Sequence, residues 1–272
     1  MQTKPTQRTA LITGASAGLG AEFARQLATK GHNLVLTARR TDRLESLATE
    51  LAAEFGIQTH VYTADLADPA SPSSLCQKLA DDGIDIDILI NNAGYGVTGT
   101  LTVPDWKTHT DFLSVMVNSL VEFCYLLLPG MQQRGFGQII NVASMAALVP
   151  GAPGHTLYAA SKAFVVRFSE SLAMENLETG VKVQALCPGF TYTEFHDVTG
   201  TRDQMSGMSE KMWLKAEDVI SYSLNQIEQK DGLPVSIPGR QYRTIERLLR
   251  WAPKKLAYKN MRKRAKDFRQ LD

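Results

Sequence analysis

The sequence contains few cysteines, no long hydrophobic run and no histidine pattern typical of a metal site. Its three cysteines lack CxxC spacing, so we predict neither disulfides nor a thiolate metal site, and interpret them as buried thiols of a reducing compartment. The five histidines show no HExxH spacing, and none is assigned to a metal. The longest apolar run, 123–128, is far shorter than the roughly 20 residues of a membrane span. Residues 1–8 lack the apolar core of a secretory signal, so we expect a cytoplasmic location.

Apolar, β-rich segments alternate with helix-like segments up to about residue 239. The expected strands are 9–13, 34–38, 59–63, 86–90, 138–142, 181–186 and 235–237. The expected helices are 18–30, 41–55, 70–82, 105–134, 158–179 and 215–230. This alternation predicts an α/β fold, in which a doubly wound parallel seven-stranded sheet carries helices on both faces, as in the Rossmann fold. Ligands of such sheets bind beyond the C-terminal ends of the strands.

Composition separates a domain from a tail. No Pro/Gly/Ser linker interrupts residues 1–239, which we expect to form a single domain. Within it, 190–214 shows no clear period and follows a strand directly, which is typical of a functional loop, here a substrate lid. Residues 240–272 hold 12 Lys/Arg against three acids, whereas 1–239 hold 17 against 25, so the net charge of +1 conceals a basic tail.

A glycine-rich turn joins the first expected strand to the first expected helix. Its spacing is GxxxGxG, and its candidate ligand-binding residues are Gly14, Ser16, Ala17, Gly18, Leu19 and Gly20. Glycines allow a tight turn and let backbone N–H groups approach a pyrophosphate at the positive end of a helix. By itself the turn is equally compatible with a purely structural strand–helix connection.

Two arginines follow the second expected strand, where a carboxylate would bind the ribose of NAD. Arg39 and Arg40 suit instead the 2′-phosphate of NADP, because a guanidinium group binds phosphate through two hydrogen bonds. The alternative is that both are solvated at a helix start, where positive charge is unfavourable. We therefore predict NADP(H) as cofactor, with NAD(H) second.

Polar residues also follow the third and fourth expected strands. They are Asp65 and Leu66 after the third strand, and Asn91, Asn92, Ala93 and Gly94 after the fourth. Singly, Asp65 is more often a helix cap and the Asn-Asn-Ala-Gly segment a turn. Their shared place at the ligand edge makes Asp65, Leu66, Asn91, Ala93 and Gly94 candidates for cofactor contact.

Tyr158 and Lys162 lie four positions apart in an expected helix and so share one face. A cation beside the phenol favours phenolate, which a general acid/base requires at cellular pH. A surface Tyr–Lys pair would be the ordinary interpretation of this spacing. Ser144 follows the fifth expected strand at the ligand edge, where its hydroxyl can polarise a carbonyl group.

Together these motifs, in this order, resemble the classical short-chain dehydrogenase/reductase family over about residues 8–239. The resemblance implies that Tyr158 is the catalytic acid/base, that Lys162 lowers its pKa and holds the nicotinamide ribose, and that Ser144 orients the carbonyl. Asn118 would complete the tetrad by holding a water of the proton relay. The reaction would be hydride transfer between a nicotinamide and a carbonyl or alcohol, without a metal.

The same resemblance assigns cofactor contacts beyond the glycine turn. It implies that Asp65 contacts the adenine, that Asn91 belongs to the cofactor loop, and that Pro188, Gly189 and Thr191 form the turn beside the nicotinamide. It also implies a homo-oligomer, dimer or tetramer, through the helices expected at 105–134 and 158–179. Nucleic acid is not an expected partner.

The expected lid carries apolar side chains that can repack around varied ligands, namely Phe190, Tyr192, Phe195, Met205, Met208, Met212 and Trp213. They predict a lipophilic carbonyl substrate, or they simply seal the loop against the core. The basic amphipathic tail suits either a membrane interface or packing over the active site or a partner subunit. A dinucleotide sensor without turnover is the alternative to an enzyme, although such a sensor would be expected to lack Tyr158, Lys162 or Ser144.

Overall fold

The fold is built on one parallel sheet of seven strands. The computed structural model describes residues 7–154, 156–194, 209–229, 232–253, 255 and 258–259. The strands are β1 (Thr9–Thr13), β2 (Asn33–Ala38), β3 (Thr59–Thr63), β4 (Ile88–Asn91), β5 (Gly137–Val142), β6 (Val181–Leu186) and β7 (Val235–Ser236). Their order is β3-β2-β1-β4-β5-β6-β7, and the neighbouring strands pair in parallel, so the predicted doubly wound sheet is confirmed.

Helices connect successive strands, because parallel neighbours require a crossover. They are α1 (Gly18–Thr29), α2 (Thr41–Phe55), α3 (Ser71–Asp81), α4 (Trp106–Leu113), α5 (Ser119–Gln133), α6 (Thr156–Glu175), α9 (Ala216–Glu228) and α10 (Arg240–Trp251). Short helical turns occupy η1 (Ser114–Asn118), η2 (Met145–Ala147) and η3 (Glu210–Met212). The turns η2 and η3 were not predicted from the sequence.

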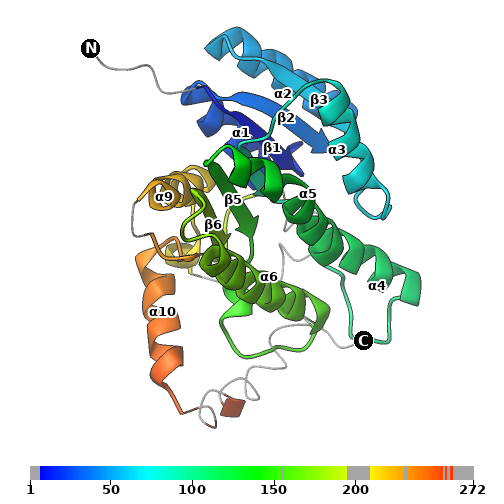
Figure 1. Cartoon of the computed structure of the whole chain (residues 1–272). Coiled ribbons are helices and arrows are strands. Elements are labelled where there is room, and N and C mark those ends of the chain that lie inside the picture. The colour runs from blue at the N-terminus through cyan, green and yellow to red at the C-terminus, as the bar shows by residue number, and fades with distance from the viewer. Residues whose placement is uncertain are drawn as a thin grey trace.

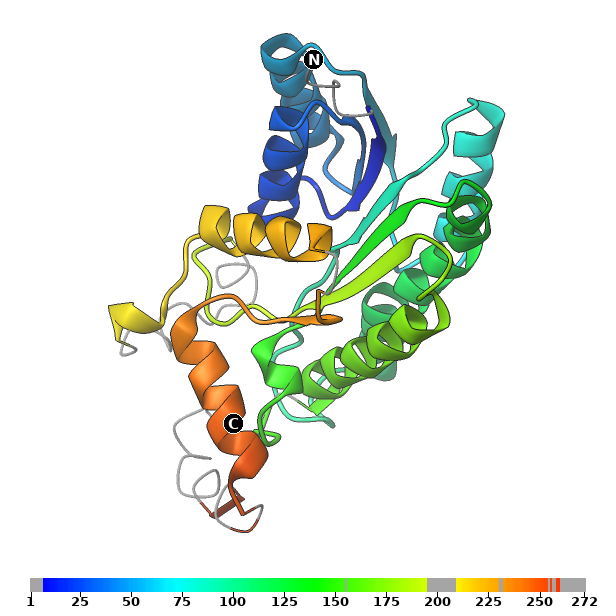
Figure 2. The same ribbon diagram turned by 60° about the vertical axis from the view of Figure 1, so that its left-hand side comes forward.

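The sheet separates two apolar cores, as the side view shows (Figure 2). Alternate residues of β1 face opposite sides, so Ile12 enters one core and Leu11 the other. The first core is closed by α1, α2 and α9, with Phe23 fully buried at its centre. The second is closed by α3, α5 and α6, with Phe123 fully buried (Figure 1). Because the central strands are buried on both faces of the sheet, their sequences are continuous apolar runs.

One helical stretch, 106–133, is long and apolar enough to cross a membrane by length and composition, and an 18-residue window within it has a mean hydropathy of 1.7. It runs through α4, the π-helical turn η1 and α5, and Phe112, Met116 and Phe123 on its inner face are buried in the fold. The core helix of a globular protein meets the same criteria. The burial of these three side chains shows that the stretch packs against the core of this fold.

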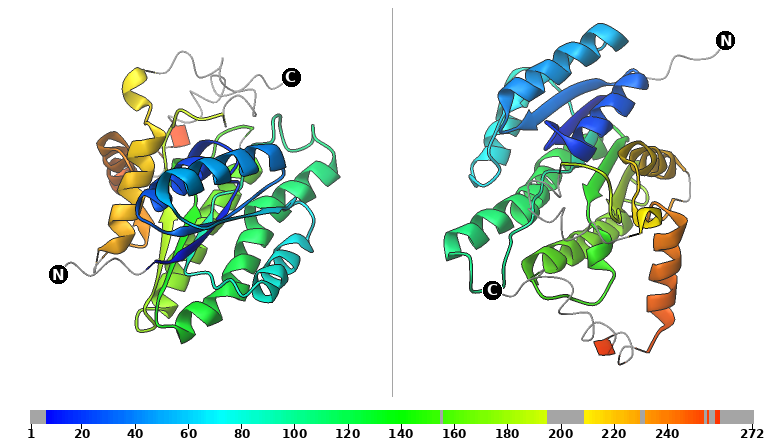
Figure 3. Two further views of the ribbon diagram at one scale, coloured as in Figure 1. Left: turned by 90° about the horizontal axis from the view of Figure 1, so that it is seen from above. Right: turned by 180° about the vertical axis from the view of Figure 1, so that it is seen from behind.

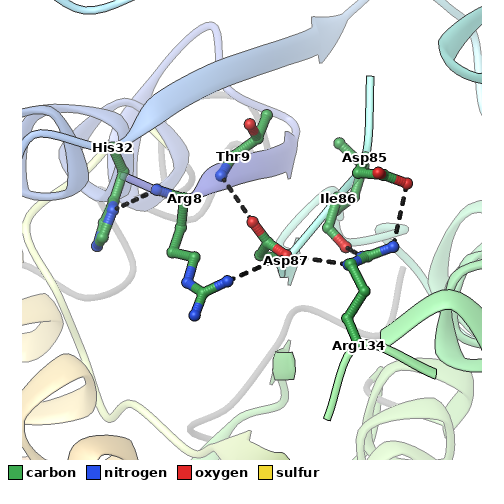
Figure 4. A network of polar contacts seen from close by, with 7 residues as sticks. All are labelled: Arg8, Thr9, His32, Asp85, Ile86, Asp87 and Arg134. Carbon is green, nitrogen blue, oxygen red and sulfur yellow. Dashed lines mark hydrogen bonds and ion pairs between the residues drawn. The ribbon is translucent and has the colours of Figure 1, made fainter. Parts of the chain in front are cut away.

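A polar network joins strand beginnings at the edge opposite the strand C-termini (Figure 4). Asp87, at the start of β4, accepts a hydrogen bond from the backbone N–H of Thr9 at 3.3 Å. Its carboxylate also lies 3.3 Å from Nε of Arg134 and 3.9 Å from Arg8. Arg134 further donates to the carbonyl oxygen of Ile86 at 2.6 Å. The network fastens β1, β4 and the end of α5 away from any strand-end site.

The first part of the expected basic tail forms α10, which projects from the two helical layers (Figures 1 and 3). Tyr242 of α10 is nevertheless buried, and its hydroxyl accepts from the backbone N–H of Phe190 at 2.9 Å and donates to the carbonyl of Met212 at 2.5 Å. These two partners belong to opposite ends of the expected lid. The helix is therefore fastened to the domain. Most of the expected lid, residues 195–208, lies outside the described residues, as do residues 260–272.

Candidate active site

The glycine-rich turn forms an open backbone cradle between β1 and α1. Gly14 and Gly18 have φ angles of 66° and 55°, which favour glycine, and a Cβ on Gly20 would lie 2.3 Å from the carbonyl oxygen of Gly14. Helix α1 begins after Ala17 without a side-chain cap and without an acid in its first turn. Its first N–H groups and positive end are thus suited to an anion such as a pyrophosphate. This geometry fits a dinucleotide.

Asn92, which sequence reasoning passed over, holds this turn to the end of β4. Its side-chain amide donates to the carbonyls of Thr13 at 2.9 Å and Gly14 at 3.2 Å. The Thr13 hydroxyl in turn accepts from the backbone N–H groups of Asn92 and Ala93, each at 3.0 Å. This contact could have been predicted from the sequence, because the glycine-rich turn and the 92–93 segment follow β1 and β4, which are neighbouring parallel strands.

Asn91 and Asp65 lie at the predicted edge but already have partners within the protein. The Asn91 side chain is buried and donates to Asn141 at 2.9 Å, which places it under the strand ends. Asp65 is exposed and accepts from the backbone N–H of Ala67 at 3.0 Å, as a turn residue does. Leu66 is buried in a core. A direct contact of any of the three with a cofactor stays a prediction.

The residues after β2 form a basic surface beside the glycine-rich turn. Arg40 donates to the Ser16 hydroxyl through Nε at 3.2 Å and through a terminal nitrogen at 3.1 Å. Arg39 is exposed, and its charge acts to lower the pKa of Tyr95, although burial is the larger effect and raises it. Arg43, one turn into α2, was missed from the sequence, although it lies three positions beyond Arg40.

Ser144 and Tyr158 meet at the C-terminal ends of the strands. Tyr158 is partly buried near the start of α6, and a hydrogen bond links its side chain to Ser144, which follows β5. The Ser144 hydroxyl also accepts from the backbone N–H of Ala146 at 3.1 Å, which fixes its position at the start of η2. A phenol and a hydroxyl in this arrangement can share one substrate oxygen.

Lys162 lies deeper than the spacing alone suggested. Its ammonium group is buried, donates to the carbonyl of Val142 at 2.6 Å, and is 5.9 Å from the centre of the Tyr158 ring. Burial lowers the pKa of Lys162 to about 8. Burial likewise raises the pKa of Tyr158 above its usual value, while the Ser144 hydrogen bond acts to lower it. Desolvation of the phenol outweighs the Ser144 hydrogen bond, and the lowering of the Tyr158 pKa by Lys162 stays a prediction.

Asn118 occupies the last position of the π-helical turn η1 and is exposed. The turn was not predicted, since a wider helical turn leaves no periodic mark in a sequence. π-Helical turns often occur at functional sites, because the extra residue shifts a side chain away from the regular helical positions. The position of Asn118 in such a turn supports, without establishing, the predicted fourth member of the tetrad.

A largely apolar pocket adjoins Tyr158. It is lined by Val97, Gly99, Thr100, Leu101, His109, Phe112, Gly154, Thr156, Leu157 and Tyr158. His109 is buried in its wall, and its Nε2 lies 2.8 Å from the Leu101 carbonyl, which ties the loop after β4 to α4. The pocket is thus bounded by the loop after β4, by α4 and by the start of α6.

The two described ends of the lid close on one another through aromatic rings and a short bridge. Tyr192 and Trp213 stack with centroids 4.7 Å apart, and Phe190 lies 5.8 Å from the same indole. Thr191 pairs with Leu214 and is buried, so its hydroxyl bonds only to the Gly189 carbonyl within the described residues. The neighbouring Thr193, missed from the sequence, faces the glycine-rich turn instead. The expected lid residues Phe195, Met205 and Met208 lie outside the described residues.

The nicotinamide-side turn predicted at 188–189 borders the catalytic residues. The carbonyl of Pro188 accepts from the backbone N–H of Met145 at 2.9 Å, which joins this turn to the segment that carries Ser144. Gly189 lies under the Tyr242 ring. Together, the glycine cradle, the basic surface, the Ser–Tyr pair and the pocket lie along one edge of the sheet.

The seven-stranded parallel sheet and the glycine-rich turn at its strand ends define a Rossmann-type fold. The sequence profile of the short chain dehydrogenases matches residues 8–204, and the chain belongs to this family.

Curated relatives are similar over about two thirds or more of this chain. It is 32% identical over 194 residues to a very-long-chain 3-oxoacyl-CoA reductase of Anas platyrhynchos, covering 70% of this chain and 62% of that protein. It is 34% identical to 17-beta-hydroxysteroid dehydrogenase type 3 of Danio rerio, covering 66% and 59%. It is 35% identical to sulfoacetaldehyde reductase 2 of Chromohalobacter salexigens, covering 77% and 84%. The matches thus span less than two thirds of the first two relatives.

Solved structures are similar over nearly the whole chain. A short-chain dehydrogenase from Sphingobium yanoikuyae in complex with NADPH has a TM-score of 0.80 at 30% identity, covering 97% of each chain. A bulky-bulky ketone specific alcohol dehydrogenase from Comamonas testosteroni has a TM-score of 0.75 at 28% identity, covering 92% of this chain and 96% of that one.

Proposed function

We propose that the protein is an NADP(H)-dependent oxidoreductase that interconverts a carbonyl and an alcohol, with Tyr158 as acid/base. The observation that carries the proposal is the hydrogen bond between Tyr158 and Ser144 at the mouth of an apolar pocket, with Lys162 one helical turn away in α6. Membership of the short chain dehydrogenases supports the reaction class.

In the reductive direction, Ser144 and Tyr158 bind the substrate carbonyl oxygen from two sides. When bound, the nicotinamide supplies the hydride to the carbonyl carbon. Tyr158 then donates its phenolic proton to the oxygen as negative charge develops there, and the Ser144 hydroxyl stabilises the same charge. Lys162, whose ammonium donates to the Val142 carbonyl in this structure, would hold the nicotinamide ribose and lower the Tyr158 pKa. Asn118 holds a water that returns the proton.

The cofactor preference rests on the charge after β2. The glycine cradle and the uncapped start of α1 receive the pyrophosphate, Asp65 and the 91–94 segment flank the adenosine side, and 188–191 flank the nicotinamide. Arg39 and Arg40 occupy the place of the carboxylate that would favour NAD. A 2′-phosphate is therefore favoured there, in line with the NADPH complex of the similar Sphingobium protein.

A lipophilic carbonyl compound is the proposed substrate. Val97, Leu101, Phe112 and Leu157 line the pocket, and the aromatic lid stem adds further apolar surface nearby. The names of the oxoacyl-CoA, hydroxysteroid and bulky-ketone relatives support this class, whereas the sulfoacetaldehyde reductase shows that polar substrates also occur among its relatives.

We also propose a homo-oligomer in the cytoplasm. Large apolar side chains are exposed on α5 and α6, among them Tyr125, Phe164 and Met174, and a partner subunit would cover them. Peripheral membrane contact through 240–272 is a second proposal, based on the exposed Trp251 and Leu248 of the basic helix α10. Cosedimentation with anionic vesicles tests it, and equal partition of the full chain and a 1–239 truncation would contradict it.

The competing function is an NADPH sensor without turnover. The intact Ser144–Tyr158 pair favours the enzyme, because a sensor has no use for a proton donor in a substrate pocket. A panel of ketones and aldehydes, followed at the nicotinamide absorbance, distinguishes the two. Turnover supports the enzyme, and binding of NADPH without turnover on any substrate supports the sensor.

A further inference from the structure

Two guanidinium groups and one carboxylate meet beside the glycine-rich turn. Arg43 lies 3.0 Å and 2.9 Å from the two carboxylate oxygens of Glu194, and Arg40 lies 3.3 Å from one of them. The arginines belong to the start of α2, whereas Glu194 follows β6, about 150 residues further along the chain. The contact therefore joins the expected cofactor-phosphate surface to the first residues of the lid.

The start of α2 carries two arginines and one acid. Arg40 is the N-cap residue, without a side-chain cap, and Arg43 lies in the first turn, where positive charge opposes the helix dipole. Asp42 is the acid of that turn, and Arg40 is further occupied by Ser16. Glu194 supplies the additional negative charge, and hydrogen bonds from Arg43 first and Arg40 second hold its pKa below the usual value.

The residue before Glu194 lies over the cradle itself. A Cβ on Gly18 would be 3.3 Å from Cβ of Thr193, so the chain passes directly across the glycine-rich turn at this point. Thr193 and Glu194 thus lie over the two neighbouring places where a pyrophosphate and a 2′-phosphate would bind.

We propose that Glu194 is an internal competitor of the 2′-phosphate: it occupies Arg40 and Arg43 in the free enzyme and is displaced when NADP(H) binds. Arg43 is accordingly a phosphate ligand beyond the predicted Arg39 and Arg40. The inference rests on the proposed NADP(H) dependence and adds that selectivity between NADP and NAD is limited by an acid outside the cofactor motifs.

The expected interaction energies favour displacement of Glu194 by the 2′-phosphate, and the ion pairs of Glu194 are still strong enough to weaken phosphate binding measurably. The three side chains are 42–47% exposed, and exposed ion pairs contribute about 0.2–1 kcal/mol, which corresponds to roughly 1.5- to 5-fold in affinity. A phosphate monoester carries about −1.5 to −2 charge at pH 7 and three acceptor oxygens, against one charge and two oxygens for Glu194. The 2′-phosphate therefore displaces Glu194, and the competition lowers the affinity for the phosphate a few-fold.

Calorimetric titration with two adenosine nucleotides isolates the effect of Glu194 on binding of the 2′-phosphate. Adenosine 2′,5′-bisphosphate carries the 2′-phosphate and adenosine 5′-monophosphate does not, so Glu194→Gln should tighten binding of the first about 1.5- to 5-fold and leave the second unchanged. Glu210→Gln is the matched control, because Glu210 is an exposed acid at the other end of the lid. An equal effect on both nucleotides, or no difference from Glu210→Gln, would overturn the proposal.

Arg43→Gln provides the second variant. It should weaken binding of the bisphosphate by about ten-fold, as loss of a charged hydrogen bond does, and it should reduce the effect of Glu194→Gln when the two are combined. Arg167→Gln, on the far helix α6, is the control for a lost surface charge. If the wild-type protein does not distinguish the two nucleotides, the proposed NADP(H) preference fails. If it distinguishes them and the Glu194 and Arg43 variants do not matter, only this inference fails.

Discussion

The ring of Tyr242 lies against the backbone of Gly189 so closely that no side chain fits between them: a Cβ on Gly189 would be 1.9 Å from Cζ of the tyrosine. This contact connects α10 to the turn beside the segment that carries Ser144. Glycine at position 189, which the motif assigns to the cofactor, is therefore also required by the first helix of the basic tail.

Gly189→Ala should destabilise the fold and disturb the site together. Tyr242 is 3% exposed, so its ring cannot move aside cheaply, and overpacking of this kind costs about 1–3 kcal/mol. Thermal unfolding measures the loss, and kinetics should show a raised KM for the carbonyl substrate. Gly151→Ala is the matched control, because nothing lies within 4 Å of its Cβ position. Equal melting temperatures of the two variants would contradict this account of the contact.

Tyr242→Phe keeps the ring and removes its two hydrogen bonds to the lid stem. Because Phe190 and Met212 then lose partners, we expect a loss of about 1–2 kcal/mol in stability and a higher KM for the carbonyl substrate. Cofactor affinity should change little. If the KM and the melting temperature both match the wild-type values, α10 does not hold the lid stem through this hydroxyl.

Lys162→Met should remove activity without lowering stability. Between pH 8 and 10.5 the unfolded chain binds more protons at this position than the folded chain, because burial lowers the pKa from 10.5 to about 8. The buried charge therefore costs stability below pH 8, on the order of 1–3 kcal/mol, and this cost is relieved as the pH rises through that window.

Denaturant unfolding of both proteins at several pH values measures this difference. The stability advantage of Lys162→Met should be largest below pH 8 and should shrink toward pH 10. An advantage that is constant with pH would mean that the ammonium is not desolvated in the folded protein.

Ser144→Ala tests the support of the phenol. It removes the hydrogen bond that acts to lower the Tyr158 pKa and the group that stabilises charge on the substrate oxygen, so kcat should fall about 10²–10³-fold with cofactor affinity retained. In the reductive direction, which needs protonated Tyr158, the falling limb of kcat against pH should also move to higher pH, in the direction of a higher Tyr158 pKa. Ser161→Ala, which loses only a hydrogen bond to the Tyr158 carbonyl within α6, should retain activity.

Asp87→Asn should separate stability from function. The Asp87 side chain is 11% exposed and pairs with Arg134 and Arg8 at the edge opposite the site, so the substitution should cost about 1–3 kcal/mol of stability. NADPH affinity and kcat should stay at wild-type values. A selective loss of cofactor binding would show that the two edges of the sheet are coupled.

The fold could be predicted from the sequence because hydrophobic periodicity is a property of short, local segments. The strands Thr9–Thr13, Thr59–Thr63 and Val181–Leu186 have the predicted bounds, as does α2. The other strands and helices differ from the expected bounds by four residues at most, and these differences arise at frayed or capped ends. The π-helical turn that ends at Asn118 was not predictable, since it leaves no periodic mark in a sequence.

The candidate site was predicted where a strand end carries a recognisable motif, and missed where the residue acts through a distant partner. Ser144 and Tyr158 were found and do meet. Tyr242 was overlooked because its importance depends on Phe190 and Met212, which lie 52 and 30 residues away along the chain. Such contacts leave no local pattern in a single sequence.

The most direct test of the account compares wild-type protein with Tyr158→Phe, by fluorescence titration with NADPH and NADH and by NADPH oxidation with a panel of lipophilic ketones. We predict that both proteins bind NADPH with similar affinity and in preference to NADH, and that only the wild type turns over. Turnover by Tyr158→Phe at the wild-type rate, or the absence of turnover by the wild type on every ketone and aldehyde, would contradict the central claim that Tyr158 is the proton donor of a carbonyl reductase.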